Sequence, residues 1–533
     1  MLFTSYEFLA FIIIAFILYY IIPKKFQWML LLVFSYIFYA LSGIENLAYI
    51  VVTTLTTYFI SGKISSLYEK QSAYLKANKG VLDREQKKAY KASVKKVTWR
   101  WLVFCLVLNF GILAVVKYSA FTISNINILL HTFGVSGDLA SVSFLLPLGI
   151  SFYTFQSMGY VIDVYRGKYK AEKNLGKVAL FVSFFPQLIQ GPISRFDDLS
   201  KTMFEEHAYD AKTVSFGLQR IMWGYFKKVV VADRLLVAVK MLYGDPGSYT
   251  GAYVLVGMVL YAIQLYGDFT GGIDITIGIA EVFGIKVQEN FLQPYFSKNI
   301  VEYWNRWHIS LGSWFKEYLF YPISVCQPML KLSKNSRKKF GDAIGKRIPV
   351  YIATIAVWFV TGFWHGAAWN FIVWGLMNCL VILVSEECKP LYERFHSRFP
   401  DLKPKWWYRF FCIVRTFLLM SCLRSFDCYR DVPLTYRMWG EMFTKFNPKI
   451  FVDGSLLQIG LTGYDYAVVA VAVALFILVS NLELIGKGSV REQIATKPVL
   501  VRYAIFYGLF LAILIFGAYG IGYDSSQFIY NQF

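Results

Sequence analysis

Long, uninterrupted stretches of apolar residues recur along this chain and restrict what it can fold into. Two of them read FLAFIIIAFILYYII (8–22) and AVVAVAVALFILV (467–479). Only 17% of the residues are charged, whereas soluble proteins carry about 25%. A helix needs about 20 mostly apolar residues to cross the hydrocarbon core of a bilayer, and the stretches predict an all-α polytopic membrane protein with about 10 to 12 spanning helices.

The form of these stretches argues against two other interpretations. A transmembrane barrel would show segments of about ten residues with alternating polarity instead of continuous apolar runs. The first run is not expected to be a removable signal peptide, because no basic region precedes it and no small-residue cleavage site follows it. A second apolar segment (27–42) begins almost at once. The lipid bilayer is therefore the expected surroundings of the chain.

The net charge of +20 lies mainly between the apolar segments. From Lys63 to Arg100 there are 11 Lys and Arg residues against three acidic ones, and basic clusters recur at 166–177, 331–347, 389–409 and 487–502. Basic connections are typical of the cytoplasmic side. Residues 63–100 are therefore expected to be a cytoplasmic loop, with both chain ends outside. No nucleic-acid motif accompanies these clusters, so nucleic acid is not an expected partner.

The seven cysteines are not expected to form disulfides or a metal site. They contain no C-x-x-C pair, and several lie in or beside apolar segments, where a small buried hydrophobic residue is the simpler interpretation. The two histidines considered below lie in different segments and lack the i, i+4 spacing of a zinc-binding helix. We predict no bound metal and no bound cofactor.

The middle of the chain, residues 178–330, mixes apolar stretches with Pro and Gly, as in FFPQLIQGPI (184–193) and in residues 252–285. Irregular backbone at membrane depth is tolerated only where protein buries it or where it lines a water-filled cavity. Re-entrant pieces and a functional site are therefore expected here. The apolar stretches 348–363 and 369–385 then predict a membrane-buried hairpin with His365 near its apex.

Two histidines lie in strongly apolar surroundings. His308 is part of EYWNRWHISLGSWFKEYLFYP (302–322), and His365 is part of GFWHGAAWN (362–370). Ionisable groups inside a membrane are rare and functional by default, although each imidazole could equally be a packing residue bonded to backbone. The small residues after His365 leave room for a ligand but also allow close helix packing. On the residues alone, an acyl- or proton-transfer enzyme and a transporter both remain open.

Other catalytic motifs are missing from the sequence. No G-x-S-x-G elbow is present, which leaves a serine hydrolase without an anchor, and no G-x-x-x-x-G-K-[ST] loop is present for nucleotide hydrolysis. GDFTGGID (267–274) is rich in glycine but lacks the order of a dinucleotide-binding loop. Its Asp268 and Asp274 could bind a cation or hold a partner Arg, and could equally cap a helix or bond to backbone.

Four longer strings resemble a known family. They are LLPLGISFYTFQSMGYVIDVYRGK (145–168), FFPQLIQGPISRF (184–196), QENFLQPYFSKNIVEYWNRWHISLGSWFKEYLFYP (288–322) and TGFWHGAAWNFIVWGL (361–376). Together they resemble the membrane-bound O-acyltransferase family, in its bacterial alginate O-acetylation and teichoic-acid D-alanylation branch. The resemblance is good over about residues 1–390 and looser beyond. It implies a helical membrane fold with re-entrant segments and a central tunnel that an acyl thioester enters from the cytoplasm.

The resemblance also implies roles for individual residues. His365, in the WHG motif, is the implied catalytic residue, and His308, in the WHISL motif, is the implied second active-site residue. His308 could orient the acceptor or stabilise the oxyanion. A neutral imidazole can take the proton of an attacking hydroxyl, and a positioned general base contributes about 10²–10⁴-fold. Further positions are expected to line the tunnel or bind substrate. Five lie in the matched strings, namely Trp364, Trp307, Arg306, Asn305 and Gln190, and the sixth is Asp268 of GDFTGGID.

The implied function is transfer of an acetyl group from a cytoplasmic thioester, either acetyl-CoA or an acyl carrier, for O-acetylation of an extracytoplasmic polysaccharide. The expected location is the bacterial cytoplasmic membrane, and the expected partner is an extracytoplasmic acetyltransferase of the GDSL/SGNH type. D-alanyl transfer to teichoic acid is the alternative within the family. A polysaccharide or lipid transporter with histidine proton relays is the alternative from another class.

Two departures from the alginate acetylase pattern bear on the acceptor. DFTGGID (268–274) stands where those proteins typically read D-F-S-G-Y-S-D, and Leu423-Arg424-Ser425 stands where they usually read Phe-Arg-Ala. The spans beyond the second histidine motif nevertheless favour the acetylase branch, because a minimal acyltransferase core would not need them.

We expect a single membrane domain over residues 1–533, with a core at about 1–390, additional spans within about 410–522 and a tail at 523–533. The additional spans are expected at 410–423, 464–482 and 503–522. The tail contains SSQFIYNQF (525–533), which fits an aromatic anchor at the membrane surface. Its F-x-Y-x-x-F spacing is also similar to the end of a small membrane partner in the alanylation system. By that resemblance Tyr530 would carry the acyl group as a phenyl ester.

Overall fold

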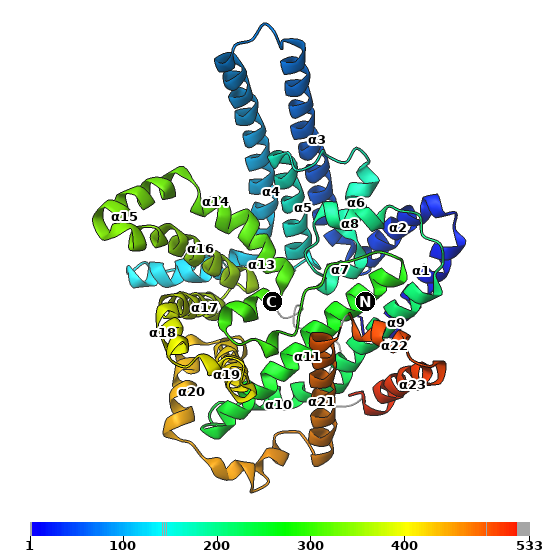
Figure 1. The fold of residues 1–533 in the computed structure, drawn as a ribbon, viewed down its shortest axis with the longest axis vertical. Coiled ribbons are helices and arrows are strands. Elements are labelled where there is room, and N and C mark those ends of the chain that lie inside the picture. The colour runs from blue at the N-terminus through cyan, green and yellow to red at the C-terminus, as the bar shows by residue number, and fades with distance from the viewer. Residues whose placement is uncertain (1–2, 141, 143, 145, 487, 520–533) are drawn as a thin grey trace. The chain divides into compact units, whose positions relative to one another are not determined.

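The computed structural model describes residues 3–519 except 141, 143, 145 and 487 (Figure 1). The described residues form helices and no β-strand, with an isolated antiparallel bridge between Phe291 and Trp307. The predicted all-α class is therefore confirmed. The chain groups into two compact units, residues 1–214 with 280–287 and residues 215–279 with 288–533. A single domain over the whole chain stays a prediction.

Seven helical segments of the described chain are long and apolar enough to cross a membrane. Some of the expected membrane-spanning segments form helices that are not among these seven, because the helices are too short or carry too many charged residues. The first two form α1 (Tyr6–Ile21) and α2 (Gln27–Ala40), of 16 and 14 residues, which is shorter than the about 20 that a crossing needs. Segment 410–423 lies in α19 (Trp406–Tyr429), which carries charged residues along its length. The seven are Ile44–Ala77, Arg84–Thr132, Ala252–Val282, Arg347–His365, Trp369–Glu387, Gly463–Ile485 and Val499–Phe516.

The first unit is built around two long helices that continue past their apolar parts. Residues 63–100, expected to be a loop, are instead mostly helical, because α3 runs to Ala77 and α4 begins again at Arg84. A capping box starts α4: Asp83 accepts from the Gln86 amide, and the Gln86 side chain accepts from the Asp83 amide. The two helices extend beyond the other helices of this unit (Figure 1). The helices of the unit are α1, α2, α3 (Leu47–Ala77), α4 (Arg84–Thr132), α5 (Ile150–Arg166), α6 (Leu175–Ser183), α7 (Phe185–Gln190) and α8 (Phe196–Met203).

The orientation of this hairpin gives a testable prediction. Because the basic residues outnumber the acidic ones by eight (11 − 3) between Lys63 and Arg100, this end should be cytoplasmic. In a variant without native cysteines, Ala77→Cys should resist membrane-impermeant thiol reagents in intact cells. Ser136→Cys is the matched control, because it follows the opposite end of α4 and is also exposed. Labelling of Cys at 77 together with protection at 136 would reverse the predicted topology.

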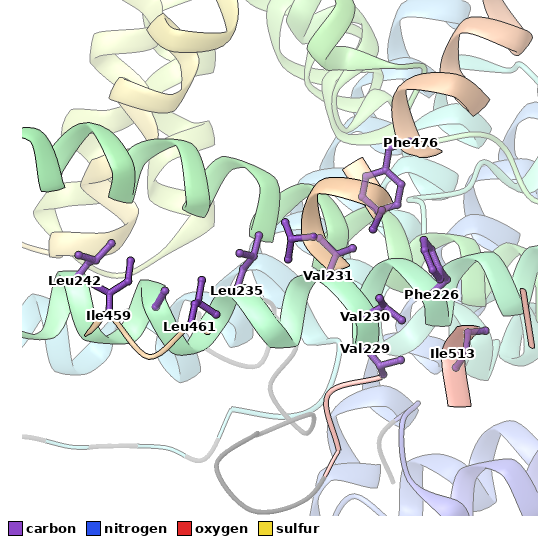
Figure 2. Close-up of a cluster of buried hydrophobic side chains, with 13 residues drawn as sticks. Phe226, Val229, Val230, Val231, Leu235, Leu242, Ile459, Leu461, Phe476 and Ile513 are labelled. Atoms are coloured by element: carbon purple, nitrogen blue, oxygen red, sulfur yellow. The ribbon is translucent and has the colours of Figure 1, made fainter. Parts of the chain in front are cut away.

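The second unit contains the remaining helices. Its α- and π-helices are α9 (Ala211–Tyr225, whose first residues belong to the first unit), the π-helix η3 (Phe226–Ala232), α10 (Asp233–Gly244), α11 (Ala252–Val282, whose last residues, from Ala280, belong to the first unit), α12 (Ile300–Arg306), α13 (Ile309–Phe315), the π-helix η5 (Lys316–Phe320), α14 (Tyr321–Ser324), α15 (Gln327–Gly345), α16 (Arg347–His365), α17 (Trp369–Glu387), α18 (Lys389–Arg398), α19, α20 (Val432–Thr444), α21 (Gly463–Ile485), α22 (Val490–Ala495) and α23 (Val499–Phe516). Figure 2 shows part of its core, where η3 and α10 pack against side chains of α21 and α23. Phe226 and Phe476 meet there edge to face, with ring centroids 6.2 Å apart.

The glycine-rich residues 252–285 are regular, and the expectation of re-entrant pieces there was wrong. Residues Ala252–Val282 form one continuous helix of 31 residues. The glycines allow backbones to approach: a Cβ at Gly271 would lie 2.8 Å from the Gly224 carbonyl oxygen, and one at Gly278 would lie 2.7 Å from that of Gly217. Small residues at helix contacts have this use in membrane proteins.

Irregular backbone does occur elsewhere in the middle region, as predicted. In the first unit, α6 and α7 are separated at Phe184, whose ψ of 104° is not helical. In the second unit, residues 300–324 form short helices and a π-helical turn instead of one span. His308 lies between two of these short helices.

Candidate active site

His365 lies where two packed helices meet. It is the last residue of α16, and α17 begins at Trp369 after a connection of three residues, so the predicted hairpin is confirmed. The helices are close because Gly362 and Gly375 lack side chains: a Cβ on either would collide with the carbonyl oxygen of Phe371 or Trp358. The imidazole is partly buried. Its ring lies 4.8 Å from that of Trp374 and 5.0 Å from that of Trp364.

His308 is held in an unusual backbone conformation between α12 and α13. Its φ of 49° and ψ of 54° are left-handed, a region that few residues other than Gly, Asn and Asp adopt and that often marks a functional site. Asn290 stabilises this turn. Its side-chain oxygen accepts from Ser310 N at 3.0 Å and from Ser310 Oγ at 2.9 Å, and it lies 3.3 Å from His308 Nδ1. Its backbone oxygen accepts from Ile309 N at 3.0 Å.

The structure brings the two histidines to one indole ring. The Trp364 ring centroid lies 6.0 Å from that of His308, and Trp364 also contacts His365. His308 is 3% exposed, and it lies outside the candidate membrane spans. Burial, together with the positive charge of Arg424, lowers the pKa of His308 to about 3. His308 is therefore a neutral imidazole at any physiological pH.

A buried arginine completes this region, and sequence reasoning did not assign it to the site. The Arg424 guanidinium carbon lies 4.8 Å from the Trp374 ring centroid, 5.0 Å from that of Trp307 and 5.6 Å from that of Trp304. Arg424 also pairs with Asp427 at 3.2 Å. The available signal was an arginine directly after the apolar segment 410–423, a position where a charge is costly.

The departure at residues 423–425 has a structural counterpart. The Ser425 hydroxyl, which replaces the usual alanine, accepts a hydrogen bond from Trp439 Nε1 at 2.8 Å. The Asn370 side chain donates to the Phe426 backbone oxygen at 3.0 Å. These bonds connect α19 to α20 and α17, and so fix the part of α19 that carries Arg424.

The other predicted site residues differ in their surroundings. Trp307 and Trp364 are buried in the histidine region. Arg306 pairs with Glu302 at 2.7 Å, and Asn305 is exposed. Gln190 is the buried last residue of α7 in the first unit. Tyr530 lies outside the described residues.

Asp268 belongs to a buried charge cluster. Its carboxylate lies 2.6 Å from Lys228 Nζ, which also pairs with Asp233 at 2.7 Å. Asp274 is bonded to Arg220 Nε at 3.0 Å and also pairs with Lys227. The partner-Arg interpretation of Asp274 is thus confirmed. Helix capping is wrong for both aspartates, because they lie well inside α11.

The arrangement supports proton transfer and charge stabilisation. The imidazoles of His308 and His365, aromatic rings and one buried guanidinium surround the same indole-rich region. Among the described residues no group of three or more His, Cys, Asp or Glu side chains is placed to hold a metal ion. The chemistry that these side chains offer is that of a general base beside positively charged hydrogen-bond donors.

Comparison with known proteins shows which sequences this chain is similar to. The family model described as MBOAT, membrane-bound O-acyltransferase family, matches residues 173–425. The chain is 32% identical over 477 residues to the protein named probable alginate O-acetylase AlgI of Pseudomonas putida, covering 89% of this chain and 86% of that one. It is 29% identical to a peptidoglycan O-acetyltransferase of Helicobacter pylori, over 69% of this chain and 66% of that one. It is 28% identical to a teichoic acid D-alanyltransferase of Bacillus subtilis, over 51% and 65%.

Proposed function

We propose, from the premise that this chain belongs to the membrane-bound O-acyltransferase family, that it moves an acetyl group from a cytoplasmic thioester for O-acetylation of an extracytoplasmic polysaccharide. The chain is a multi-pass membrane O-acyltransferase. The acetyl group, the donor, the direction of transfer and the acceptor belong to the proposal.

One observation carries the choice of acetyl over D-alanyl. The similarity extends over 86% of the Pseudomonas putida acetylase at 32% identity, but over 65% of the Bacillus subtilis D-alanyltransferase at 28%. The similarity to the acetylase thus takes in much more of this chain, 89% against 51%. D-alanyl transfer to teichoic acid remains the second candidate. A transporter has no support, because the chain belongs to an acyltransferase family.

The proposed reaction uses the site as follows. An acceptor hydroxyl attacks the thioester carbonyl, and the imidazole of His365 takes the hydroxyl proton as the new C–O bond forms. When the tetrahedral intermediate collapses, the C–S bond breaks and the sulfur leaves with the proton from His365. The neutral imidazole of His308 is proposed to orient the acceptor.

The proposal includes a setting for this reaction. We place the protein in the bacterial cytoplasmic membrane, with acetyl-CoA or an acyl carrier as the donor on the cytoplasmic side. An extracytoplasmic acetyltransferase of the GDSL/SGNH type would pass the acetyl group to the polysaccharide. A gene for such an esterase-like protein beside this one would support acetylation, whereas genes for a carrier protein and a D-alanine ligase would support alanylation.

The test is mass analysis of surface glycans from cells with and without this protein. Mild alkali releases both acetyl and D-alanyl esters, so one extract measures both groups. Loss of polysaccharide acetate alone is the expected result. Loss of D-alanine with unchanged acetate would contradict the proposal and favour the second candidate.

Tyr530 gives a separate prediction about the outward step. A phenol with a pKa of about 10 is a better leaving group than an aliphatic alcohol, so a tyrosyl ester could pass its acyl group on. Tyr530→Phe keeps the ring and removes the nucleophile, and should block surface acylation as fully as loss of His365. Phe528→Leu is the control, because it changes an aromatic anchor without touching the phenol. Normal acylation by Tyr530→Phe would leave the tail an anchor only.

A further inference from the structure

We propose that Arg424, with the indole N–H groups of Trp304 and Trp374, binds the carbonyl oxygen of the acyl group and stabilises the oxyanion that forms on it. The proposal adds a residue role to the proposed function and rests on that function, because it requires that an acyl carbonyl reacts beside His365. It does not depend on whether the acyl group is acetyl or D-alanyl.

The first observation is the placement of a permanent positive charge. Arg424 is 6% exposed, and its guanidinium lies within 5.6 Å of the ring centroids of Trp304 and Trp374. Aromatic faces attract a cation, and more strongly where water is excluded. The guanidinium is thus fixed in a dry region, where a charge stabilises a developing negative charge far better than it does in water.

The second observation is a group of buried donors. Arg424 donates through Nη1 to Asp427 at 3.2 Å. Its Nε and Nη2, and the Nε1 atoms of Trp304 and Trp374, are buried and make no hydrogen bond of standard geometry among the described residues. The Tyr303 hydroxyl, which interacts with the guanidinium, is a neighbouring protein oxygen that competes for these donors. Leaving such a donor unsatisfied costs about 1–3 kcal/mol, and native proteins rarely do so without a reason. Four donors of this kind in one region indicate a site for an oxygen acceptor.

The third observation is the distance to the general base. The Trp374 ring lies 5.8 Å from that of Trp304 and 4.8 Å from that of His365. The donors and the base therefore flank the same region. A carbonyl carbon bound there would have a base for the attacking hydroxyl nearby and donors for its oxygen, which are the two requirements of acyl transfer.

Arg424 is proposed to act while the tetrahedral intermediate exists, when negative charge lies on the former carbonyl oxygen. As the acceptor oxygen bonds to the carbonyl carbon, the π electrons move onto the carbonyl oxygen and the hydroxyl proton moves to His365. The N–H groups of Arg424 and the two indoles donate to this oxyanion. When the carbonyl re-forms, the C–S bond breaks and the thiolate takes the proton from His365, which leaves Arg424 unchanged.

The experiment measures acyl transfer by Arg424→Gln and Arg424→Lys in membrane vesicles supplied with acetyl-CoA. Loss of one oxyanion donor typically costs about 10²–10³ in kcat, so Arg424→Gln should lose that factor while KM for the donor stays within about threefold. Arg424→Lys keeps the charge but loses the paired donors, and should also be slow. Arg415→Gln is the matched control on the same helix, because Arg415 donates to the Lys298 backbone oxygen and not into this region. Its rate should be normal.

Chemical rescue separates catalysis from folding. Arg424→Ala should recover at least tenfold in rate with added guanidinium at a concentration that leaves the protein folded. Guanidinium should not rescue His365→Ala. A folded Arg424→Ala protein with the normal kcat, or one that guanidinium does not rescue, would overturn the proposal. A raised KM with normal kcat would also overturn it, and would place Arg424 in donor binding.

A cellular assay keeps this proposal distinct from the choice of acyl group. Alkali-labile acetate and D-alanine are measured on surface glycans of cells that carry each variant as their only copy. If the wild type adds D-alanine and not acetate, the acetyl assignment fails, yet Arg424→Gln should still lose that D-alanine. A wild-type amount of acetyl or D-alanyl ester in cells with Arg424→Gln would contradict the proposed role of Arg424 and leave the choice of acyl group unaffected.

Discussion

His365→Ala is expected to abolish acyl transfer while the protein stays inserted and folded. The imidazole is the only proposed acceptor for the hydroxyl proton, and a positioned base contributes about 10²–10⁴-fold. The side chain ends α16 and is partly buried, so its removal leaves the close contacts of Gly362 and Gly375 in place. The measurement is alkali-labile acylation of surface glycans, with detergent size-exclusion chromatography of the purified variant as the folding check.

Two further histidine variants make this result specific. His396 lies on α18, outside the site, and its side chain contacts Tyr408 of α19. The His396→Ala protein should therefore acylate surface glycans normally. His308→Ala should cause a severe loss of acylation, and a partial loss would still be compatible with an orienting role for His308. Near-normal acylation by His365→Ala would refute its assignment as the base.

Among the substitutions proposed for this protein, Lys228→Met is expected to cause the largest loss of folding stability. Lys228 is 0% exposed and lies between the carboxylates of Asp233 and Asp268, both of which are also buried. Removing the cation removes the ion pair that each of these two buried carboxylates makes with it, and breaking a buried pair typically costs about 3–5 kcal/mol. For a unit of this size that lowers the unfolding midpoint by about 5–8 °C. Thermal unfolding in detergent measures it.

Asp268→Asn is the matched comparison. It leaves Lys228 paired with Asp233 and removes one of two like charges, so its midpoint should fall much less than that of Lys228→Met. Equal losses in the two variants would refute this account of the cluster. The same variant examines the predicted substrate role of Asp268: a stable Asp268→Asn protein without activity would support that role.

Much of the fold followed from the sequence because membranes impose simple rules. Apolar length located α16, α17 and α21 closely, whereas α23 begins at Val499, four residues before the expected 503. Pro186 correctly indicated a break between α6 and α7. Two local expectations were wrong. The basic residues 63–100 were expected to be a loop, but Lys, Gln, Glu and Ala favour helix outside a membrane as well.

The glycines of α11 misled for a different reason. In the sequence these glycines suggest a weak helix. In the structure they allow the backbone of another helix to approach closely at Gly224 and Gly217. A single sequence does not state which helix lies opposite. The same limit applied to Arg424: its charge was visible, but the three tryptophans around it come from α12, from the connection before His308 and from α17.

The two histidines were predicted as site residues because each stands in apolar, tryptophan-rich surroundings, and their catalytic roles stay a prediction. Their shared contact with Trp364 could not be found in that way, since about 55 residues separate them. Asn290 was missed as well. It has no catalytic signature, and its importance comes from accepting the bonds that hold the left-handed turn of His308.

The short helices around His308 have a consequence for how such enzymes can diversify. His365 is carried by a rigid hairpin, but His308 is carried by a bent connection whose shape depends on Asn290. Under the proposed function, substitutions in that connection would move His308 without repacking any long helix. Loops on a rigid scaffold commonly change specificity while the chemistry is retained, and relatives of this chain are named for different acceptors and acyl groups.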